Sequence, residues 1–573
     1  MDKELVLVTL LHDVGKILQR CGKTEPSCEL GKGFYEHDKL SCGFIEKYLG
    51  EEYAELFKEG KWKIADYASA SERIESETIG RPEATPLLDP TYPVKDQSLP
   101  LEEEVWYPVT FIDFNTLPEI YRAVKFNEAP INYDGICKVL LNLAEKAKKI
   151  KDIDSLIETY DYIYRTTALL VPAAVYKAVP NTSLYGHSRL AAPLSTCDKI
   201  RLILIDIKGI QKFITDIKGE KESSKRLRGR SFFLQLLQRA LTDKIADLLN
   251  LTPLHNISFE PGKIIFIVCG DVKDKVDEIL IKLEEWSNYT IQFASAISDE
   301  VKVGDLKIFG NEDVNFKRLL DQLFERQNII GKPTYTQEIG VDVFNDVYPK
   351  DGLINVKEIE GIDSLTAGEV TEGEISEINL ISLIIGHATR ELKYVIEVLY
   401  KDGVEVKNEY RRVMDYGIGK VYIKPLNVGF ILIHRNANLS AVKSVIQTEK
   451  DLAKRIKVLT VNETKDFIYP ELLEEFDKIS FGYITLSTYH PVDENGRFKS
   501  LDNIAEYIGI GVIDGDKITE IVRRLSAFPG RFMTFSTLMD FAFAHIVTKK
   551  ISLENRASTV VLYSGGDDLA IYG

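Results

Sequence analysis

Apolar residues near the start of the chain recur at the spacing of an α-helix. Leu7, Leu11 and Leu18 share one helical face, and a second apolar stripe runs through IEKYLGEEYAELF. We therefore predict a small helical domain over residues 1–85. Residues 86–195 begin with a proline-rich stretch that lacks periodicity and end in helical patterns, which predicts a linker followed by further helices.

Strands and helices alternate from about residue 196 onward. The short apolar run RLILIDI is typical of a buried strand, and a helical pattern, the strand KIIFIVCG and another helical pattern follow it. A similar order returns near the end, where YIGIGVI precedes two helical patterns, the strand STVVLYS, a GGDD turn and the strand LAIY. This order predicts two related α/β units, over residues 196–330 and 501–573.

Residues 331–500 mix the short strands of GKVYIKPLNVGFILIH with an apolar run, NLISLIIGHATRELKYVIEVLY, that we expect to be helical. We predict a mixed α/β domain here, without a cysteine zinc site because the chain has no CxxC pair. The predicted fold class is therefore α/β, or α+β, with several domains. The chain stops at Gly573 directly after its final strand, so we expect the last α/β unit to be truncated.

Composition and charge narrow the classes of protein that fit. The 573 residues are 45% hydrophobic and 28% charged, as in ordinary globular proteins. The chain carries 72 basic and 88 acidic residues, which gives a net charge of −16. Nucleic acid must therefore be held by a local basic patch or by partner subunits, and a histone-like binder is excluded.

The cysteines and the apolar stretches of the chain indicate the cellular compartment of the protein. The six cysteines are scattered, which argues against a disulfide framework and fits a reducing cytoplasm. The chain start lacks a basic leader, and no stretch of about 18 uninterrupted apolar residues occurs. We therefore expect a cytoplasmic protein that is neither exported nor membrane-spanning.

Two glycines and two aspartates occupy the predicted turn between the last two strands, in YSGGDDLAIY. Gly565 and Gly566 tolerate positive φ, which suits a tight hairpin and lets a ligand approach the backbone. Asp567 and Asp568 then place two carboxylates at the hairpin tip. A surface hairpin is the alternative for this tetrapeptide alone, because turns favour glycine and aspartate.

A second pair of carboxylates, Asp514 and Asp516, ends the strand of YIGIGVIDGD. Residues two apart on a strand point to the same side, so both can face one site. If this strand neighbours the hairpin, three or four carboxylates cluster and need cations, and Mg²⁺ or Mn²⁺ suits oxygen ligands with phosphate substrates. The pattern predicts a two-metal site for nucleotidyl transfer from an ATP-like substrate.

The first α/β unit has no matching carboxylate cluster in its sequence. Asp206 lies near the end of RLILIDI, and a single acid is more typical of a cap or turn than of a metal ligand. This unit is better suited to holding a second nucleotide. Basic residues follow beside the start of a helix, at Lys221, Lys225, Arg226, Arg228 and Arg230. They could bind phosphate or RNA, and a solvated charged loop is the alternative.

The dipeptide His12–Asp13, in LLHDVGK, lies on a predicted helix. An adjacent His and Asp can each coordinate one metal ion or bridge two, if more distant His and Asp residues complete the shell. His37 in YEHDKLS and Asp66 in IADYASASER are the nearest candidates. Such a site would hydrolyse phosphodiesters with a metal-bound hydroxide. A structural role is the alternative for the dipeptide alone.

Eight segments, in order along the chain, resemble blocks of the large subunit of type III CRISPR effector complexes. They are HDVGKILQR, HDKLSCGFI, ADYASASER, NTSLYGHSRLAA, DIKGIQKFI, LRGRSFFLQLL, DGDKIT and SGGDDLAIYG. The resemblance implies an N-terminal HD domain and two ferredoxin-like palm domains, similar to those of polymerases and nucleotide cyclases. In that family the GGDD palm converts ATP into cyclic oligoadenylates when the complex binds target RNA, and the HD domain cuts single-stranded DNA.

The resemblance also implies roles for single residues. The catalytic residues of the second palm would be Asp514, Asp516, Asp567 and Asp568, of which Asp514, Asp567 and Asp568 would bind Mg²⁺ or Mn²⁺. The residues facing ATP would be Ser564, Gly565 and Gly566, with Asp206 and Arg228 as further candidates in the first palm. The HD site would hold a transition metal such as Mn²⁺ or Ni²⁺ through His12, Asp13, His37 and Asp66.

The implied partners are other subunits of the effector complex, the CRISPR guide RNA, target RNA and single-stranded DNA, with no membrane. Cyclase activity is better supported than nuclease activity, because EEYAELFKEGKWKIADYA lacks the additional histidine that the family carries before its ADxxSxxER block. Two alternatives stay open. One is a catalytically weak scaffold that binds guide RNA and partner subunits. The other is a diguanylate cyclase coupled to an HD phosphodiesterase, which GGDD in place of GGDEF disfavours.

Overall fold

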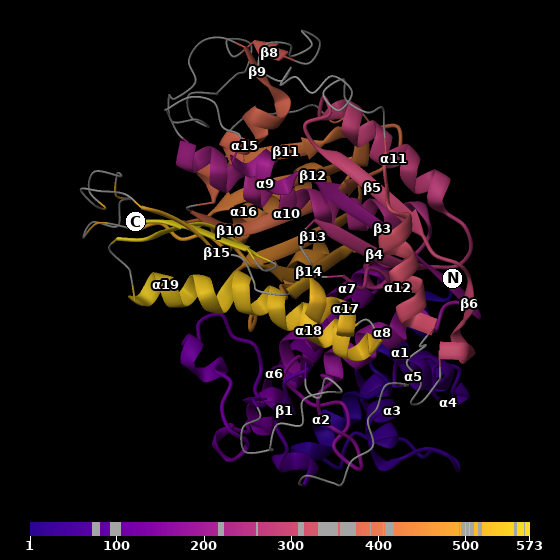
Figure 1. Ribbon diagram of the computed structural model, residues 1–573. Coiled ribbons are helices and arrows are strands. Elements are labelled where there is room, and N and C mark those ends of the chain that lie inside the picture. Colours follow the sequence, from indigo (N-terminus) through magenta and orange to yellow (C-terminus); the bar gives the residue numbers. More distant parts are fainter. Residues whose placement is uncertain are drawn as a thin grey trace.

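The computed structural model shows helices packed around several β-sheets, with the N-terminal helices gathered at one end of the molecule (Figure 1). The predicted α/β fold class with several domains is confirmed. The structure describes residues 1–70, 81–91, 105–215, 223–258, 262–306, 315–330, 353–355, 374–389, 391–404, 406, 417–491, 493, 499, 504, 509–513, 518–525, 527–554, 558–565 and 568–573.

The first 195 residues are mainly helical. Their helices are α1 (Lys3–Leu10), α2 (Val14–Arg20), α3 (Glu36–Tyr48), α4 (Glu51–Glu59), α5 (Lys63–Ser69), α6 (Tyr133–Ala147), α7 (Ile153–Ala168) and α8 (Leu184–Leu194). Side chains that accept a backbone N–H hydrogen bond fix where four of them begin: Asp2, Asn132, Asp152 and Ser183. In the predicted linker, β1 (Leu87–Leu88) pairs with β2 (Trp106–Tyr107).

The first α/β unit is an antiparallel sheet with helices on both faces. Its strands are ordered β4 (Lys263–Val268), β3 (Lys199–Lys208), β5 (Gln292–Ile297) and β7 (Asn328–Ile329), and β6 (Val301–Lys302) pairs with the start of β3. Ile203 and Ile205 pack with α10 (Ser223–Leu248) and α11 (Lys273–Trp286). Leu202 and Leu204 pack with α8 and α12 (Asn315–Arg326). Burial on both faces explains the uninterrupted apolar run from Leu202 to Ile205 in the middle of β3.

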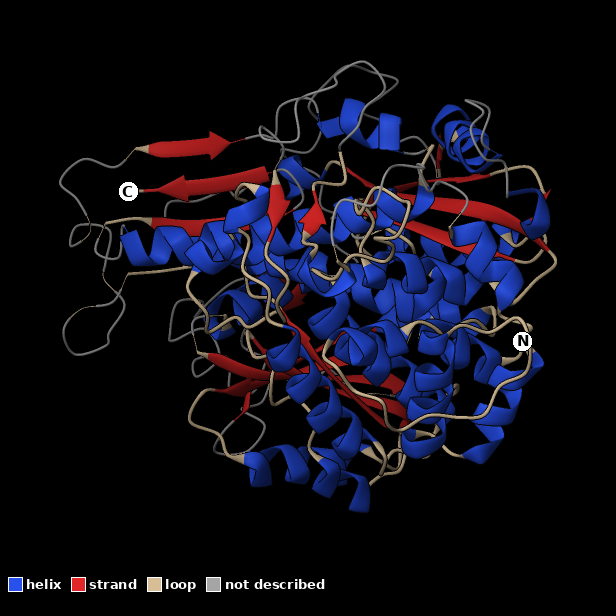
Figure 2. Ribbon diagram, turned by 90° about the horizontal axis from the view of Figure 1, so that it is seen from below, coloured by secondary structure: helices blue, strands red, loops and turns tan. Residues whose placement is uncertain are grey.

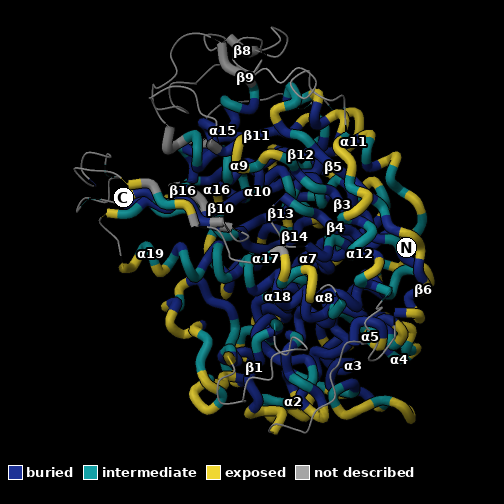
Figure 3. Tube along the Cα trace, viewed as in Figure 1, coloured by how far each residue is buried: buried dark blue, intermediate teal, exposed yellow. Residues whose placement is uncertain are grey.

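A second five-stranded sheet occupies the middle of the chain. Its order is β11 (Gly417–Ile423), β12 (Val428–His434), β10 (Leu392–Tyr400), β13 (Ala453–Val461) and β14 (Ile479–Ile484), antiparallel except for the pair β13–β14. The helices of this region are α15 (Glu377–Ala388) and α16 (Leu439–Glu449), and β8 (Leu353–Asn355) pairs with β9 (Glu374–Ser376). Strands β10 and β13 are buried over most of their length and are therefore dark blue in Figure 3.

The predicted helix through NLISLIIGHATRELKYVIEVLY is wrong in its second half. Helix α15 ends at Ala388, and strand β10 begins at Leu392. A continuous apolar run is compatible with either a buried helix or a buried strand, so periodicity alone does not separate them. Neighbouring strands β12 and β13 pair with β10 along its length, and this tertiary pairing decides in favour of a strand.

The C-terminal α/β unit is a three-stranded antiparallel sheet that projects from one edge of the molecule (Figures 1 and 2). Its order is β15 (Ile510–Ile513), β17 (Asp568–Tyr572) and β16 (Val560–Gly565). The helices between β15 and β16 are α17 (Ile518–Leu525), α18 (Pro529–Phe541), the π-helical turn η12 (Ala542–Val547) and α19 (Thr548–Glu554). Strands β16 and β17 form the predicted hairpin.

All six cysteines are paired, so the expectation of no disulfide framework is wrong. The disulfides are Cys21–Cys137, Cys28–Cys42 and Cys197–Cys269. Their partners are 116, 14 and 72 residues apart in sequence, so only the packing of distant elements brings the thiols together. Disulfides are rare in a reducing cytoplasm but occur inside hyperthermophilic archaea and bacteria.

Within the described part of the chain, no helix combines the length and the apolar character needed to cross a lipid bilayer.

Lys457 on β13 lies where three distant segments meet. Its Nζ atom is 2.7 Å from Asp243 Oδ2 on α10 and 3.2 Å from Glu158 Oε2 on α7. Arg455 Nη1 lies 3.4 Å from Glu158 Oε1, and the Ser480 hydroxyl donates to Glu158 Oε2 at 2.6 Å. Burial alone would lower the pKa of Lys457 and raise that of Asp243, but their attraction raises the first and lowers the second. Both side chains therefore carry charge.

Replacing Lys457 with methionine should destabilise the protein, because Asp243 and Glu158 would lose the cation between them while staying buried. We expect Lys457→Met to lower the free energy of unfolding by about 3–5 kcal/mol, measured by urea denaturation. The matched control is Lys282→Met, which removes the exposed pair with Glu278 and should cost at most about 1 kcal/mol. Equal losses in the two variants would contradict the prediction.

Candidate functional site

Four residues from three separate segments meet in the N-terminal region, and all but the partly exposed Asp66 are buried. His12 and Asp13 lie in the turn between α1 and α2, Asp66 lies on α5, and His187 lies on α8. The prediction that His12 and Asp13 lie within a helix is wrong, because α1 ends at Leu10 and α2 begins at Val14. The turn allows both side chains to point to the same side.

The distances within this cluster fit a bound cation. Asp66 Oδ1 is 3.0 Å from His187 Nε2 and 3.4 Å from His12 Nε2. Asp13 Oδ2 is 3.5 Å from each of the same two nitrogens. The four ligand atoms all lie within 4.8 Å of one another. Imidazole and carboxylate ligands together suit a divalent transition metal.

The hydrogen bonds of both histidines orient Nε2 toward the carboxylates. His12 Nδ1 lies 2.6 Å from the Thr9 carbonyl oxygen, so Nδ1 carries the proton and donates it. His187 Nδ1 lies 3.0 Å from the Ser69 hydroxyl. Each Nε2 atom is buried without an aligned hydrogen bond to any described residue. Outer hydrogen bonds of this kind fix the ring orientation of metal-binding histidines.

The ionisable side chains of the cluster shift one another's pKa values. Burial alone would raise the pKa of Asp13, but Lys16 and His12 hold it well below its usual range. Burial would likewise raise the pKa of Asp66, and His12 and His187 lower it instead. Burial favours neutral His12, but Asp13 and Asp66 raise its pKa. The carboxylates are therefore ionised and available to a cation.

A second group of ligands shares Asp13. His37 Nε2 lies 3.5 Å from Asp13 Oδ1 and 3.4 Å from Asp38 Oδ1. Burial lowers the pKa of His37 to about 4, partly opposed by Asp13, so this imidazole is neutral at pH 7. Because Asp13 uses Oδ2 in the first group and Oδ1 in the second, the arrangement can accommodate two cations with Asp13 between them.

The sequence named His12, Asp13, His37 and Asp66 as possible metal ligands; the structure places His12, Asp13 and Asp66 in the first group and His37 in the second, which shares Asp13. It adds His187 and Asp38, which the sequence analysis did not assign. His187 lies outside the predicted helical domain of residues 1–85. The signal that could have found it is the histidine within NTSLYGHSRLAA, one of the eight segments that carry the family resemblance.

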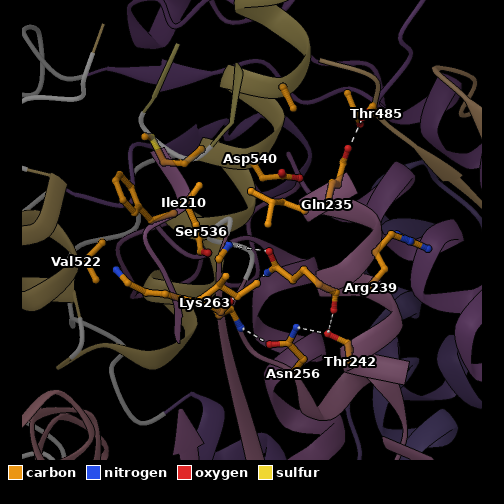
Figure 4. A pocket seen from close by; sticks show the side chains of 18 of the residues that line it. Ile210, Gln235, Arg239, Thr242, Asn256, Lys263, Thr485, Val522, Ser536 and Asp540 are labelled. Carbon is orange, nitrogen blue, oxygen red and sulfur yellow. Dashed lines mark hydrogen bonds between the residues drawn. The ribbon is translucent and has the colours of Figure 1, made fainter. Parts of the chain in front are cut away.

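A cavity of about 1320 Å³ lies between the first and the C-terminal α/β units (Figure 4). It exceeds the roughly 300–1,000 Å³ of an ordinary small-molecule pocket, so it has room for more than one nucleotide. Gln238 on α10 shapes one wall, since its Oε1 accepts from the Gly262 N–H at 2.8 Å and its Nε2 donates to the Lys263 carbonyl oxygen at 3.1 Å. Figure 4 shows Ser536 and Asp540 of α18 facing the same space.

Basic side chains line this cavity from both units. They are Lys212 on α9 (Ile210–Thr215), Lys263 on β4, Lys317 on α12, and Arg523 and Arg524 on α17. The deeper wall carries Glu158, Asp243 and Lys457 of the buried ion network. Lysine and arginine at the walls of a concave site suit phosphate groups.

The hairpin that carries GGDD reaches this cavity through Ser564. This side chain is buried, and its hydroxyl donates to the Phe543 carbonyl oxygen at 2.5 Å. Phe543 lies in the π-helical turn η12, a type of irregularity found often at functional sites. Gly565 ends β16 opposite Asp568, which begins β17.

The backbone register places β15 directly beside β17. Ile513, the last residue of β15, pairs with Leu569, and Ile510 pairs with Tyr572. The expectation that this strand neighbours the hairpin is therefore confirmed. The predicted residues Asp514, Asp516, Gly566 and Asp567 lie outside the described residues, as does the side chain of Asp568.

Two predicted ATP-binding residues do not line the cavity. Arg228 is 1% exposed, and its Nη1 lies 3.2 Å from His490 Nδ1. It is buried because α10 packs tightly against α15, where a Cβ at Gly229 would overlap the Ser382 carbonyl oxygen. The Asp206 carboxylate instead contacts Lys208 Nζ at 2.5 Å. The alternative of a solvated charged loop does not hold for Arg230, which donates to the Phe213 carbonyl oxygen and to Asn379 Oδ1.

Among known protein families, the one described as Csm1 subunit domain B matches residues 199–327. Among curated proteins, the chain is 26% identical over 355 residues to the CRISPR system single-strand-specific deoxyribonuclease Cas10/Csm1 (subtype III-A) of Methanocaldococcus jannaschii. That match covers 50% of this chain and 43% of the relative. The matches span between 41% and 56% of the length of the curated relatives.

Solved structures share the fold. The chain aligns over its whole length with a Csm1–Csm4 cassette in complex with cA4, at a TM-score of 0.63 and 18% identity, and covers 74% of that chain. A Csm1–Csm4 cassette in complex with AMPPNP aligns with a TM-score of 0.63 and 16% identity, and 75% of that chain is covered. These comparisons confirm the resemblance to the large subunit of type III CRISPR effector complexes.

The metal site can be tested by binding. Titration of the metal-free protein with Mn²⁺ or Ni²⁺ in a calorimeter should show binding that His187→Ala weakens by at least about tenfold, because one imidazole ligand is lost. His434→Ala is the matched control, since His434 lies outside the cluster and should leave binding unchanged. Equal affinity of wild type and His187→Ala would contradict the assignment of His187.

Proposed function

We propose that this chain acts as the large subunit of a type III CRISPR effector complex and converts ATP into cyclic oligoadenylates when the complex has bound target RNA. The reaction would take place at the cavity between the two α/β units, which we assign as the two palm domains. The register between β15 and β17 is the observation that carries this proposal, because it aligns the DGD and GGDD segments.

The proposed catalytic carboxylates flank this register. Asp514 directly follows Ile513, and Asp568 directly precedes Leu569, the residue with which Ile513 pairs. Consecutive Cα atoms are about 3.8 Å apart, so each acid lies one residue away from the pair formed by Ile513 and Leu569. In this proposal Asp514, Asp567 and Asp568 bind Mg²⁺ or Mn²⁺, and Asp516 supports them.

The chain's own residues would bind and orient ATP. Ser564, Gly565 and Gly566 would face the phosphates at the hairpin, and the basic side chains of the cavity would neutralise the charge of a second nucleotide. When bound, the metal ions would lower the pKa of the attacking 3′-hydroxyl and stabilise the departing pyrophosphate. The size of the cavity supports two nucleotides side by side. The similar Csm1–Csm4 cassettes were solved with cA4 and with AMPPNP.

The cluster of His12, Asp13, Asp66 and His187 supports a second activity, hydrolysis of single-stranded DNA. A divalent cation there would supply a hydroxide for attack on a phosphodiester. Asp13 and Asp66, which stay ionised, would hold the cation, and the Thr9 carbonyl would keep the proton of His12 on Nδ1. The curated relative from Methanocaldococcus jannaschii is named a single-strand-specific deoxyribonuclease.

The proposal includes partners. The similar solved structures are Csm1–Csm4 assemblies, which supports binding to other effector subunits. A net charge of −16 argues that guide RNA and target RNA are held largely by those subunits. We place the assembly in the cytoplasm, where invading nucleic acid is transcribed.

The cyclase is tested with the assembled complex, labelled ATP, Mg²⁺ and complementary RNA. Wild type should form cyclic oligoadenylates, and Asp567→Ala combined with Asp568→Ala should lower the rate by at least about 100-fold, because removing the charge-stabilising ligands typically costs several kcal/mol. The control is His12→Ala, which should keep cyclase activity and lose DNA cleavage.

Other outcomes favour the alternatives. Assembly with RNA and partner subunits but no product in wild type would support the scaffold. Product from GTP in place of ATP would support the diguanylate cyclase.

A further inference from the structure

One arginine of α8 binds the main chain of a segment that forms a wall of the cavity. Arg189 is 3% exposed, and its guanidinium group donates to the carbonyl oxygens of Leu254, Pro253 and Asn256. The bonds from Nη2 to Pro253 and Asn256 are 3.1 and 3.0 Å long. All three acceptor residues line the cavity between the α/β units. A single side chain therefore fixes the backbone of residues 253–256.

The guanidinium group is itself held in place. Arg189 Nε lies 3.1 Å from Asp161 Oδ1 on α7, and the Tyr185 hydroxyl donates to the same oxygen at 3.0 Å. Arginine presents its N–H donors in a planar fork, so it can engage one carboxylate and several carbonyl oxygens at the same time. Residues 253–256 are therefore tied to two helices of the N-terminal region, α7 and α8.

The segment held by Arg189 leads into a counterpart of the GGDD hairpin. Residues 256–258 lie beside β4, with a bridge between Asn256 and Phe266 and a hydrogen bond from the Ile257 N–H to the Ile265 carbonyl oxygen. Strand β4 in turn pairs antiparallel with β3, as β17 pairs with β15. In the first α/β unit, residues 256–258 and β4 thus take the places of β16 and β17.

Side chains of this counterpart face the cavity. Asn256, Ser258 and Lys263 line it, and Figure 4 shows Asn256 and Lys263 at the same wall. The Asn256 side chain is fixed as well, since its Oδ1 accepts from the Ser258 N–H at 3.1 Å and its Nδ2 donates to Thr242 Oγ1 at 3.4 Å. Lysine suits a phosphate group as a point charge. Because these groups share one backbone, a shift of about 1 Å would misplace all of them.

We propose that Arg189 is a positioning residue for the second nucleotide, which binds at the wall formed by Asn256, Ser258 and Lys263. This inference rests on the proposed synthesis of cyclic oligoadenylates, in which the first ATP lies at the GGDD hairpin. Arg189 acts through the main chain of residues 253–256 and keeps the wall in its binding arrangement before the nucleotide arrives. Such preorganisation lowers the cost of binding. Loss of the arginine therefore weakens the second nucleotide and spares the first.

The test measures binding apart from turnover. The assembled complex is titrated in a calorimeter with α,β-methylene ATP and Mg²⁺, since the α–β bond of this analogue cannot be cleaved. Wild type should bind two nucleotides. Arg189→Met removes the donors and should raise the Kd of one nucleotide about tenfold, the loss typical of a hydrogen-bonded charged group. The other nucleotide should bind as in wild type, because the GGDD hairpin does not depend on Arg189.

The matched control is Arg201→Met on β3. Arg201 Nη1 donates to the Ser298 carbonyl oxygen at 3.0 Å, and Arg201 is not among the described residues that line the cavity. This variant should bind both nucleotides like wild type. Asp567→Ala combined with Asp568→Ala should weaken the nucleotide that keeps its affinity in Arg189→Met, which identifies the two sites. Binding of only one nucleotide by wild type would overturn the assignment.

Arg189→Lys separates positioning from folding. Lysine keeps a positive charge beside Asp161 but lacks the planar fork of donors, so the Kd of the second nucleotide should rise about threefold. This variant carries the test if Arg189→Met does not fold. A merely structural role predicts an equal loss of both nucleotides in a folded variant, and that result would overturn the proposal. Unchanged Kd values in Arg189→Lys and Arg189→Met would also overturn it.

Turnover distinguishes failure of the positioning role from failure of the proposed function. With labelled ATP, Mg²⁺ and complementary RNA, Arg189→Met should raise the KM for ATP about tenfold and leave kcat close to that of wild type. If wild type forms no product but the two-site binding pattern holds, the cyclase proposal fails and the positioning role stands. If wild type forms product and Arg189→Met binds both nucleotides normally, only the positioning role fails.

Discussion

The buried ion pairs of Lys457 hold three parts of the chain together. This cation on β13 lies between Asp243 of α10 and Glu158 of α7, which come from the first α/β unit and the N-terminal helices. Burying three charges is costly unless each is paired, so the segments must meet in one arrangement. The same residues line the cavity between the α/β units, so the interaction that fixes the junction also shapes the candidate site.

Helix α8 connects the two candidate sites. Its His187 faces the metal cluster, and the preceding Gly186 packs on α18, where a Cβ would meet Thr534 Oγ1 at 2.5 Å. The Ser183 N–H at the start of α8 donates to the same Thr534 oxygen at 2.9 Å. Since α18 also lines the cavity through Asp540, the two sites share one continuous layer of helices. Glycine at position 186 is required for this close approach.

Local sequence predicted much of the fold. The strands of both α/β units and the hairpin follow from short apolar runs bounded by turn residues. From the sequence, β15 is only assumed to neighbour β17, and the backbone pairing in the structure decided it. The helix prediction is wrong where a local pattern is compatible with both a helix and a strand. The run from Asn379 to Tyr400 is rich in apolar residues in both halves, and the pairing with β12 and β13 shows that it divides into α15 and β10.

For the candidate sites, the sequence by itself determined the residues that are close along the chain. His12 with Asp13 and the glycines with the aspartates of GGDD are fixed by covalent spacing and turn preference. The tertiary structure alone decided that His187 joins the cluster, that Arg228 is buried and that the cysteines pair. These groups are far apart in sequence, and contacts between them arise from the packing of whole helices and sheets, which leaves no short-range pattern in the chain.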